Sequence, residues 1–104
     1  MKRVKLALTA VLSIIVMFII LHSTPILALK THIFFNGYFK EAITTEIIDD
    51  ELHNKIDKEK LSKENAKCYT LTKPPLDKAT ESYLRNYKVS KKYLLYFAEY
   101  YGDG

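Results

Sequence analysis

An uncharged apolar stretch near the N-terminus constrains the fold of this chain more than any other feature. It begins at Leu6, ends at Leu21 and reads LALTAVLSIIVMFIIL, with Thr9 and Ser13 as its only hydroxyl side chains. The chain has 104 residues, which is too few to bury a helix that is apolar on every face. The stretch is therefore predicted to enter a membrane, either as a signal peptide or as an anchor.

Two fates of this segment remain open. The uncharged run continues to Leu29 and would form a helix of about 36 Å, long enough to span a bilayer. Alternatively, Pro25 ends the helix and a signal peptidase cleaves after Ala28. Ile26 is larger than the small residue that such a cleavage site favours. The long apolar core and this imperfect site favour retention of the segment as an anchor.

The basic residues before the stretch give it a direction. Lys2, Arg3 and Lys5 hold the N-terminus in the cytoplasm, so the chain beyond about residue 30 lies outside. We therefore divide the chain into residues 1–29, a signal peptide or N-in transmembrane anchor, and residues 30–104, a small extracytoplasmic domain. The predicted location is the cell membrane with an outward-facing C-terminal domain, or the medium if cleavage occurs near Ala28.

The positive charge of the chain does not indicate a nucleic-acid-binding protein. The formal net charge is +4, but removing the three basic residues at the N-terminus from the total of 16 leaves 13 against 12 acidic residues. Binding to DNA through counterion release needs several clustered cations. No basic block in the C-terminal part is longer than Lys91-Lys92, so we expect no nucleic-acid partner.

The segment after the apolar stretch contains a turn signal. Asn36-Gly37 tolerates the positive φ angles of a type I′ turn, and aromatic and aliphatic residues flank it. This predicts a short β-hairpin over residues 33–39. The alternative is an aromatic segment that lies in the membrane interface, with Lys30, His32 and Lys40 near the lipid phosphates.

A helical pattern follows the turn signal. Apolar residues recur at helical spacing at Ile43, Ile47, Ile48, Leu52 and Ile56. We predict a helix over residues 49–60, while the β-branched residues before it can instead extend the hairpin. Residues 68–72 are rich in strand-forming side chains and are predicted to pair with the hairpin.

Two further helices are predicted in the C-terminal part. Pro74-Pro75 ends the preceding element, and Asp77 and Ser90 resemble N-caps. The predicted helices cover residues 78–88 and 91–101, although the second run is also compatible with a strand. The expected fold class is therefore an N-terminal hydrophobic helix followed by a small α+β, mostly helical, exported domain.

One cluster of side chains resembles a metal site. Asp49, His53 and Asp57 would share one face of a helix at steps of four residues, with Asp50 beside them, and carboxylates with imidazole suit a divalent cation. The same stripe lies beside the apolar face, where a solvated polar surface is expected. We therefore predict a solvent-exposed face, with no metal, cofactor or catalytic residue.

The only cysteine, Cys68, rules out an internal disulfide. Cys68 and His53 would be a thiol nucleophile and its base if they met in the fold, but no oxyanion motif accompanies them. A small, semi-buried side chain is the favoured interpretation. A dimer through Cys68 is an alternative in an oxidising compartment.

The most distinctive feature of the predicted domain is an aromatic segment from Tyr93 to Tyr101, which suits a core edge, a bilayer interface or a partner surface. The abundance of Lys, Ile, Tyr and Asn is typical of an AT-rich bacterial genome. We predict a small exported or membrane-anchored bacterial protein that is not an enzyme and binds an envelope or membrane partner. The alternative is a secreted effector, such as a small toxin, a bacteriocin-like precursor or a signalling protein.

Overall fold

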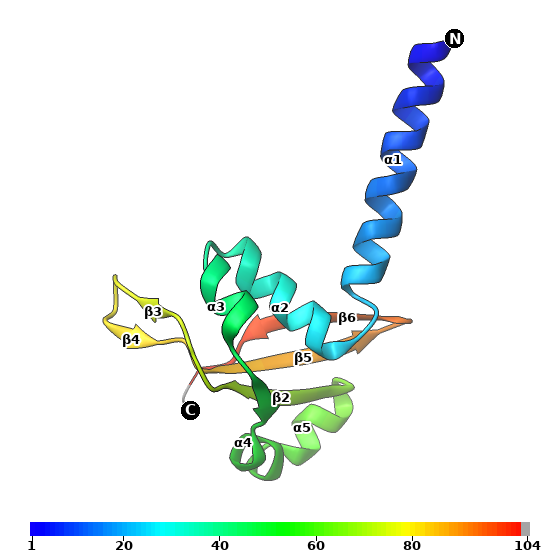
Figure 1. Cartoon of the computed structure of the whole chain (residues 1–104). Helices are drawn as coiled ribbons and strands as arrows, with labels where there is room; N and C mark the ends of the chain where they lie inside the picture. Colours follow the sequence, from blue (N-terminus) through cyan, green and yellow to red (C-terminus); the bar gives the residue numbers. More distant parts are fainter. Residues whose placement is uncertain (103–104) are drawn as a thin grey trace.

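A computed structural model describes residues 1–102, in which a long N-terminal helix projects from a small domain (Figure 1). The helices are α1 (Lys2–Leu21), α2 (Pro25–Phe35), α3 (Phe39–Thr44), α4 (Glu51–Ile56) and α5 (Lys58–Lys63). The strands are β1 (Ile47–Asp49), β2 (Ala66–Leu71), β3 (Leu76–Asp77), β4 (Ser82–Tyr83), β5 (Asn86–Lys92) and β6 (Leu95–Tyr100). This confirms an apolar helix followed by a domain of helices and strands, but "mostly helical" is a loose description of it.

The central layer of the domain is a four-stranded antiparallel sheet in the order β1-β2-β5-β6. Helices α2 and α3 cover one face of this sheet, and α4 and α5 lie against the other (Figure 1). The short strands β3 and β4 form a separate hairpin that protrudes from the domain. The domain is therefore a three-layer sandwich with the sheet in the middle.

The main hydrophobic core lies between α2 and the sheet. It contains Leu29, Ile33, Ala42, Tyr69, Leu71, Tyr87 and Val89. Alternate residues of a strand point to the same face of a sheet, so residues 69 and 71 of β2 and residues 87 and 89 of β5 meet α2 together. Leu29 and Ile33, one helical turn apart on α2, are fully buried against them.

The predicted hairpin over residues 33–39 is wrong, because Asn36-Gly37 ends a helix instead of joining two strands. Gly37 has a φ of +94°, its N–H donates to the carbonyl of Phe34, and the N–H of Tyr38 donates to the carbonyl of Ile33. These two hydrogen bonds form a Schellman motif, in which a glycine in the left-handed region satisfies the last carbonyls of a helix. The chain therefore turns from α2 into α3.

The predicted helices 78–88 and 91–101 are also wrong. Asp77 accepts the N–H of Ala79 at 3.0 Å in the β3–β4 hairpin and does not cap a helix. Residues 86–92 form β5, and the strand alternative for the last segment is the correct one, since residues 95–100 form β6. Tyr87 pairs with Tyr100 across the two strands, with ring centroids 5.6 Å apart. Such cross-strand aromatic pairs stabilise the sheet.

The remaining predicted elements are close to the structure. The helix expected over residues 49–60 is divided into α4 and α5, with a break at Asp57. The strand expected over residues 68–72 is β2, which pairs with β1 and β5 and not with a hairpin at residues 33–39.

The connection between α1 and α2 is short and well defined. The side chain of Thr24 accepts the N–H of Leu27 at 3.1 Å, and Pro25 occupies the first turn of α2, where a missing N–H is harmless. Ala28 and Leu29, which follow, are buried in the domain. The expected domain start at residue 30 and the expected cleavage site after Ala28 thus both fall inside α2.

Candidate functional site

The four residues that resembled a metal site do not share one helical face. Asp49 lies at the end of β1 and pairs with Lys67 at 2.9 Å. Asp50 is the N-cap of α4, where its carboxylate accepts the backbone N–H of His53 at 3.1 Å and lies 2.5 Å from His53 Nδ1. Asp57 accepts the hydroxyl of Tyr101 at 2.7 Å. Within residues 1–102, no group of three His, Cys, Asp or Glu side chains is arranged to hold a metal ion.

Asp57 instead joins the start of α5 to Tyr101, just after β6, and Asp50 holds the His53 ring that packs against the same tyrosine. The ring of His53 packs edge-on against Tyr101, with centroids 5.4 Å apart. The hydrogen bond to Asp57 raises the pKa of Tyr101 to about 12, so this phenol remains protonated at neutral pH. Both His53 and Asp50 are buried, and the cluster therefore closes the second face of the sheet.

Cys68 lies under this cluster and is fully buried. Burial raises the pKa of its thiol to about 11, and the carboxylates of Asp50 and Asp57 act in the same direction. A protonated, inaccessible thiol is a poor nucleophile. The structure therefore gives no support to a Cys68–His53 catalytic pair, and an interchain disulfide would require local opening of α4 from β2.

A hydrogen-bonded clip holds α4 to β2. The side-chain amide of Asn54 accepts the N–H of Cys68 at 2.7 Å and donates to the carbonyl of Cys68 at 3.0 Å. Asp50 N–H donates to the same carbonyl at 3.0 Å. Strand β1 ends at Asp49, so the amide of Asn54 takes the place of the next β1 residue. It satisfies the backbone groups of Cys68 on β2 that this missing residue would otherwise pair with.

A buried charged group that the sequence did not indicate lies on the same face of the sheet. Lys88, on β5, places its Nζ 2.8 Å from Glu99 and 3.1 Å from Glu64. The hydrogen bond to Glu99, followed by the one to Glu64, raises the pKa of Lys88, and Lys88 in turn lowers the pKa of Glu99. This triad joins β5, β6 and the end of α5, and a paired, hydrogen-bonded ammonium is the form in which a buried lysine is tolerated.

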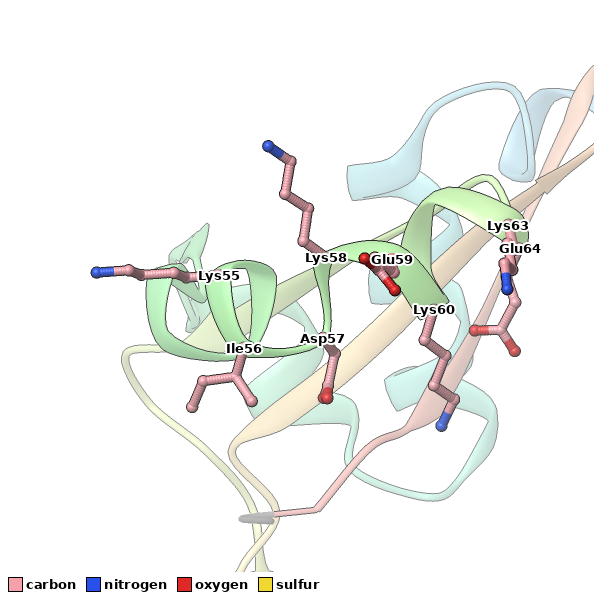
Figure 2. A pocket seen from close by; sticks show the side chains of 8 residues that line it. All are labelled: Lys55, Ile56, Asp57, Lys58, Glu59, Lys60, Lys63 and Glu64. Carbon is pink, nitrogen blue, oxygen red and sulfur yellow. The ribbon is translucent and has the colours of Figure 1, made fainter.

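A shallow hollow lies over α4 and α5. It is lined by Lys55, Ile56, Asp57, Lys58, Glu59, Lys60, Lys63 and Glu64. Figure 2 shows that Lys55, Lys58 and Lys60 point outward in different directions rather than toward a common point. Both signs of charge are interspersed, so this surface resembles an ordinary solvated face and not a ligand site.

The aromatic segment from Tyr93 to Tyr101 divides into two parts with different surroundings. Tyr96 and Ala98 pack against the core, and Tyr101 belongs to the cluster with His53. Tyr93 and Leu94, at the turn between β5 and β6, are 98% and 82% exposed. Only this turn offers large apolar side chains that take no part in packing the segment against the domain.

Helix α1 is a second, larger exposed apolar feature. Its mean hydropathy over an 18-residue window is 2.7, and none of that window is buried by the rest of the protein. Among the described residues it is the one helix long and apolar enough to cross a membrane. It is compatible with a signal peptide or with a membrane anchor.

Comparison with known proteins identifies a family. The chain matches the model of the YjcN family over residues 1–102, a range that includes α1 as well as the described domain. No curated protein matches the chain, and no solved structure matches it.

Proposed function

We propose that this chain, which belongs to the YjcN family, is a bacterial membrane-anchored protein that displays a small, non-enzymatic binding domain on the outer face of the membrane. One observation carries the proposal. Helix α1 has no buried residue, and only its outer end touches the domain, where Phe18 lies against Phe97, whereas α2, which begins four residues after α1 ends, supplies the core of the domain. An apolar helix that the protein leaves largely uncovered is stable only in an apolar solvent such as lipid.

The polar groups of α1 support this proposal. The hydroxyl of Thr9 donates to the carbonyl of Lys5, and that of Ser13 donates to the carbonyl of Thr9, both at 2.9 Å. Both side chains are therefore satisfied within the helix, as a bilayer requires. At the N-terminal end of α1, Lys2 and Arg3 favour a cytoplasmic N-terminus.

The place of Ala28 supports retention over release. Cleavage after Ala28 would remove the Thr24 cap, Pro25 and the buried side chain of Ala28 itself. The remaining α2 would begin at Leu29 without an N-cap, at the residue that should anchor it to the sheet. A released product would therefore have a weakened core.

Intact mass and location test the anchor. In bacteria that express the full chain with a C-terminal tag, we expect the unprocessed mass in the membrane fraction, resistant to alkaline extraction and accessible to protease added outside. The control is the variant Ile26→Ala, which creates an A-x-A cleavage pattern at an exposed position. It shows whether a signal peptidase can reach this part of the chain. A mature form that begins at Leu29 in the medium would overturn the proposal and favour the secreted effector.

The turn between β5 and β6 is the surface that we expect to meet an envelope partner. We call Lys91, Lys92, Tyr93 and Leu94 the β5–β6 tip. Tyr93 adopts a φ of +60°, a left-handed conformation that costs a non-glycine residue about 1–2 kcal/mol. Because its side chain is exposed and Gly or Asn would suit the turn better, the stability of the fold does not explain a tyrosine here. Aromatic residues at such positions favour partner contact.

A photoreactive phenylalanine analogue in place of Tyr93 tests this surface in intact cells. We expect one discrete protein adduct that disappears when Leu94→Ser is added. The same analogue in place of Tyr83, an exposed tyrosine on the β3–β4 hairpin, is the matched control. Tyr93→Gly should abolish partner binding while leaving the stability of the domain equal or higher. The absence of an adduct from position 93, or the same adduct from position 83, would contradict the assignment.

A further inference from the structure

Four large apolar side chains surround the turn that joins α2 to α3. We call Phe34, Phe35, Phe39 and Ile43 the α2–α3 elbow. Phe35 and Ile43 are 75% and 72% exposed. The ring of Phe34 contacts those of Phe35 and Phe39 at centroid distances of 5.5 and 4.6 Å. The elbow is thus a contiguous aromatic patch on the surface, of the kind that marks an interaction site.

The elbow is continuous with α1. A groove between them is lined by Met17 and Leu21 of α1 and, across from them, by Phe34, Phe35 and Ile43 of the elbow. Figure 1 shows α1 rising on the side of the sheet that α2 and α3 cover. Any apolar medium that surrounds the outer end of α1 therefore also reaches the elbow.

The depth of the elbow matches that of an interfacial helix. The uncharged part of α1 runs from Leu6 to Leu21 and is about 24 Å long, less than the roughly 30 Å hydrocarbon thickness of a bilayer, so the outer end of α1 lies at or inside the boundary of the hydrocarbon core. Met17 lies four residues before the end of α1 at Leu21, about 6 Å along the helix axis. Amphipathic helices at a membrane surface bury their apolar faces by about 5–10 Å. The elbow lies across the groove from Met17, so its depth below the outer end of α1 is about 6 Å, which is within the range for interfacial helices.

The charges around the elbow suit lipid phosphates. Lys30 lines the same groove, and Lys40 is exposed at the start of α3. Lysines beside an apolar patch attract anionic lipids. The acidic residue of α3, Glu41, has one carboxylate oxygen buried within the protein. Burial also lowers the pKa of His32, which shares a hydrogen bond with Asn36 and so stays neutral.

We propose that the α2–α3 elbow inserts into the outer leaflet of the bilayer that holds α1. Acyl chains then occupy the groove beside Met17 and Leu21, and Lys30 and Lys40 contact the phosphates. The inference rests on the proposed anchor and adds a second membrane contact to it. Two contacts hold the domain against the bilayer in one orientation, with the sheet beneath α2.

Single-tryptophan variants of the full chain in liposomes test the insertion. The chain contains no tryptophan, so each introduced one reports on a single position. Phe35→Trp probes the elbow, Phe18→Trp probes α1, and Tyr83→Trp on the protruding β3–β4 hairpin is the aqueous control. In phosphatidylcholine vesicles with brominated acyl chains, we expect positions 35 and 18 to lose most of their emission and position 83 to keep it.

The possible outcomes separate this inference from the anchor. Quenching at position 18 with water-exposed emission at position 35 would overturn the elbow insertion and leave the anchor intact. A blue-shifted but unquenched tryptophan at position 35 would also overturn it, because a protein surface such as a second copy would then cover the elbow. An unquenched tryptophan at position 18 would reject the anchor and the insertion together. Near-ultraviolet circular dichroism of the tyrosines verifies the fold of each variant.

Discussion

Leu29→Ala is expected to remove most of the stability of the domain. Leu29 is fully buried between α2 and the sheet, and truncation of such a leucine leaves a cavity that costs about 2–5 kcal/mol. A domain of this size rarely has more than about 3–5 kcal/mol of net stability. The variant should therefore be largely unfolded at 37 °C or have a urea midpoint close to zero.

Tyrosine signals measure this effect without interference from α1. All eight tyrosines lie outside α1, so near-ultraviolet circular dichroism in mild detergent reports on the domain alone. Leu27→Ala, on the same helix with a side chain that is 38% exposed, is the matched control and should lower the stability clearly less than Leu29→Ala does. Equal urea midpoints for the two variants would show that α2 is not part of the core.

Asn54→Ala is expected to cost about 2 kcal/mol, because it leaves the N–H of Cys68 without its partner. The amide of Asn54 satisfies both backbone groups of Cys68. The carbonyl retains Asp50 N–H, but the N–H is orphaned in a partly buried site, and such a group costs about 1–3 kcal/mol. The loss should be local at first, because α4 is released from β2 while the core around α2 remains.

The single cysteine provides a second measurement for this variant. Opening of α4 exposes the thiol of Cys68, so its alkylation rate under native conditions should rise at least about tenfold. Lys55→Ala, at the next and exposed position of α4, should alter neither the alkylation rate nor the urea midpoint. An unchanged rate in Asn54→Ala would show that the clip does not hold α4 to the sheet.

The sequence predicts the two-part organisation well and the domain less well. The apolar stretch is unambiguous because no other fold class accommodates it in so short a chain. Asn36-Gly37, in contrast, occurs both in type I′ turns and at helix C-termini. The hydrogen bond from Tyr38 N–H to the carbonyl of Ile33 decides between them, and it depends on α2 being held by the sheet. The local pattern alone favours the hairpin.

Tyrosine is the second source of error. It occurs readily in strands and at helix surfaces, and the spacing of Tyr83, Leu84 and Tyr87 fits a helix. The strand is indicated by the alternation of apolar Tyr87 and Val89 with polar Lys88 and Ser90. This alternation covers only four residues, so the helical spacing is the stronger pattern in the sequence. The Lys88–Glu64–Glu99 triad was beyond prediction, because its members come from three elements that only the tertiary fold brings together. The contact between Asp50 and His53 is different, because these residues are only three apart in the sequence and the local chain is enough to bring them together.

The hydrogen bond from Tyr96 N–H to the carbonyl of His22, at 2.8 Å, has a consequence for solubility. Strand β6 is an edge of the sheet, and unpaired edges are templates for pairing with other chains. The segment between α1 and α2 occupies part of that edge and shields it. A chain that lost residues 1–28 would present the edge to its neighbours, so the same peptide segment that reaches the membrane also guards the sheet against aggregation.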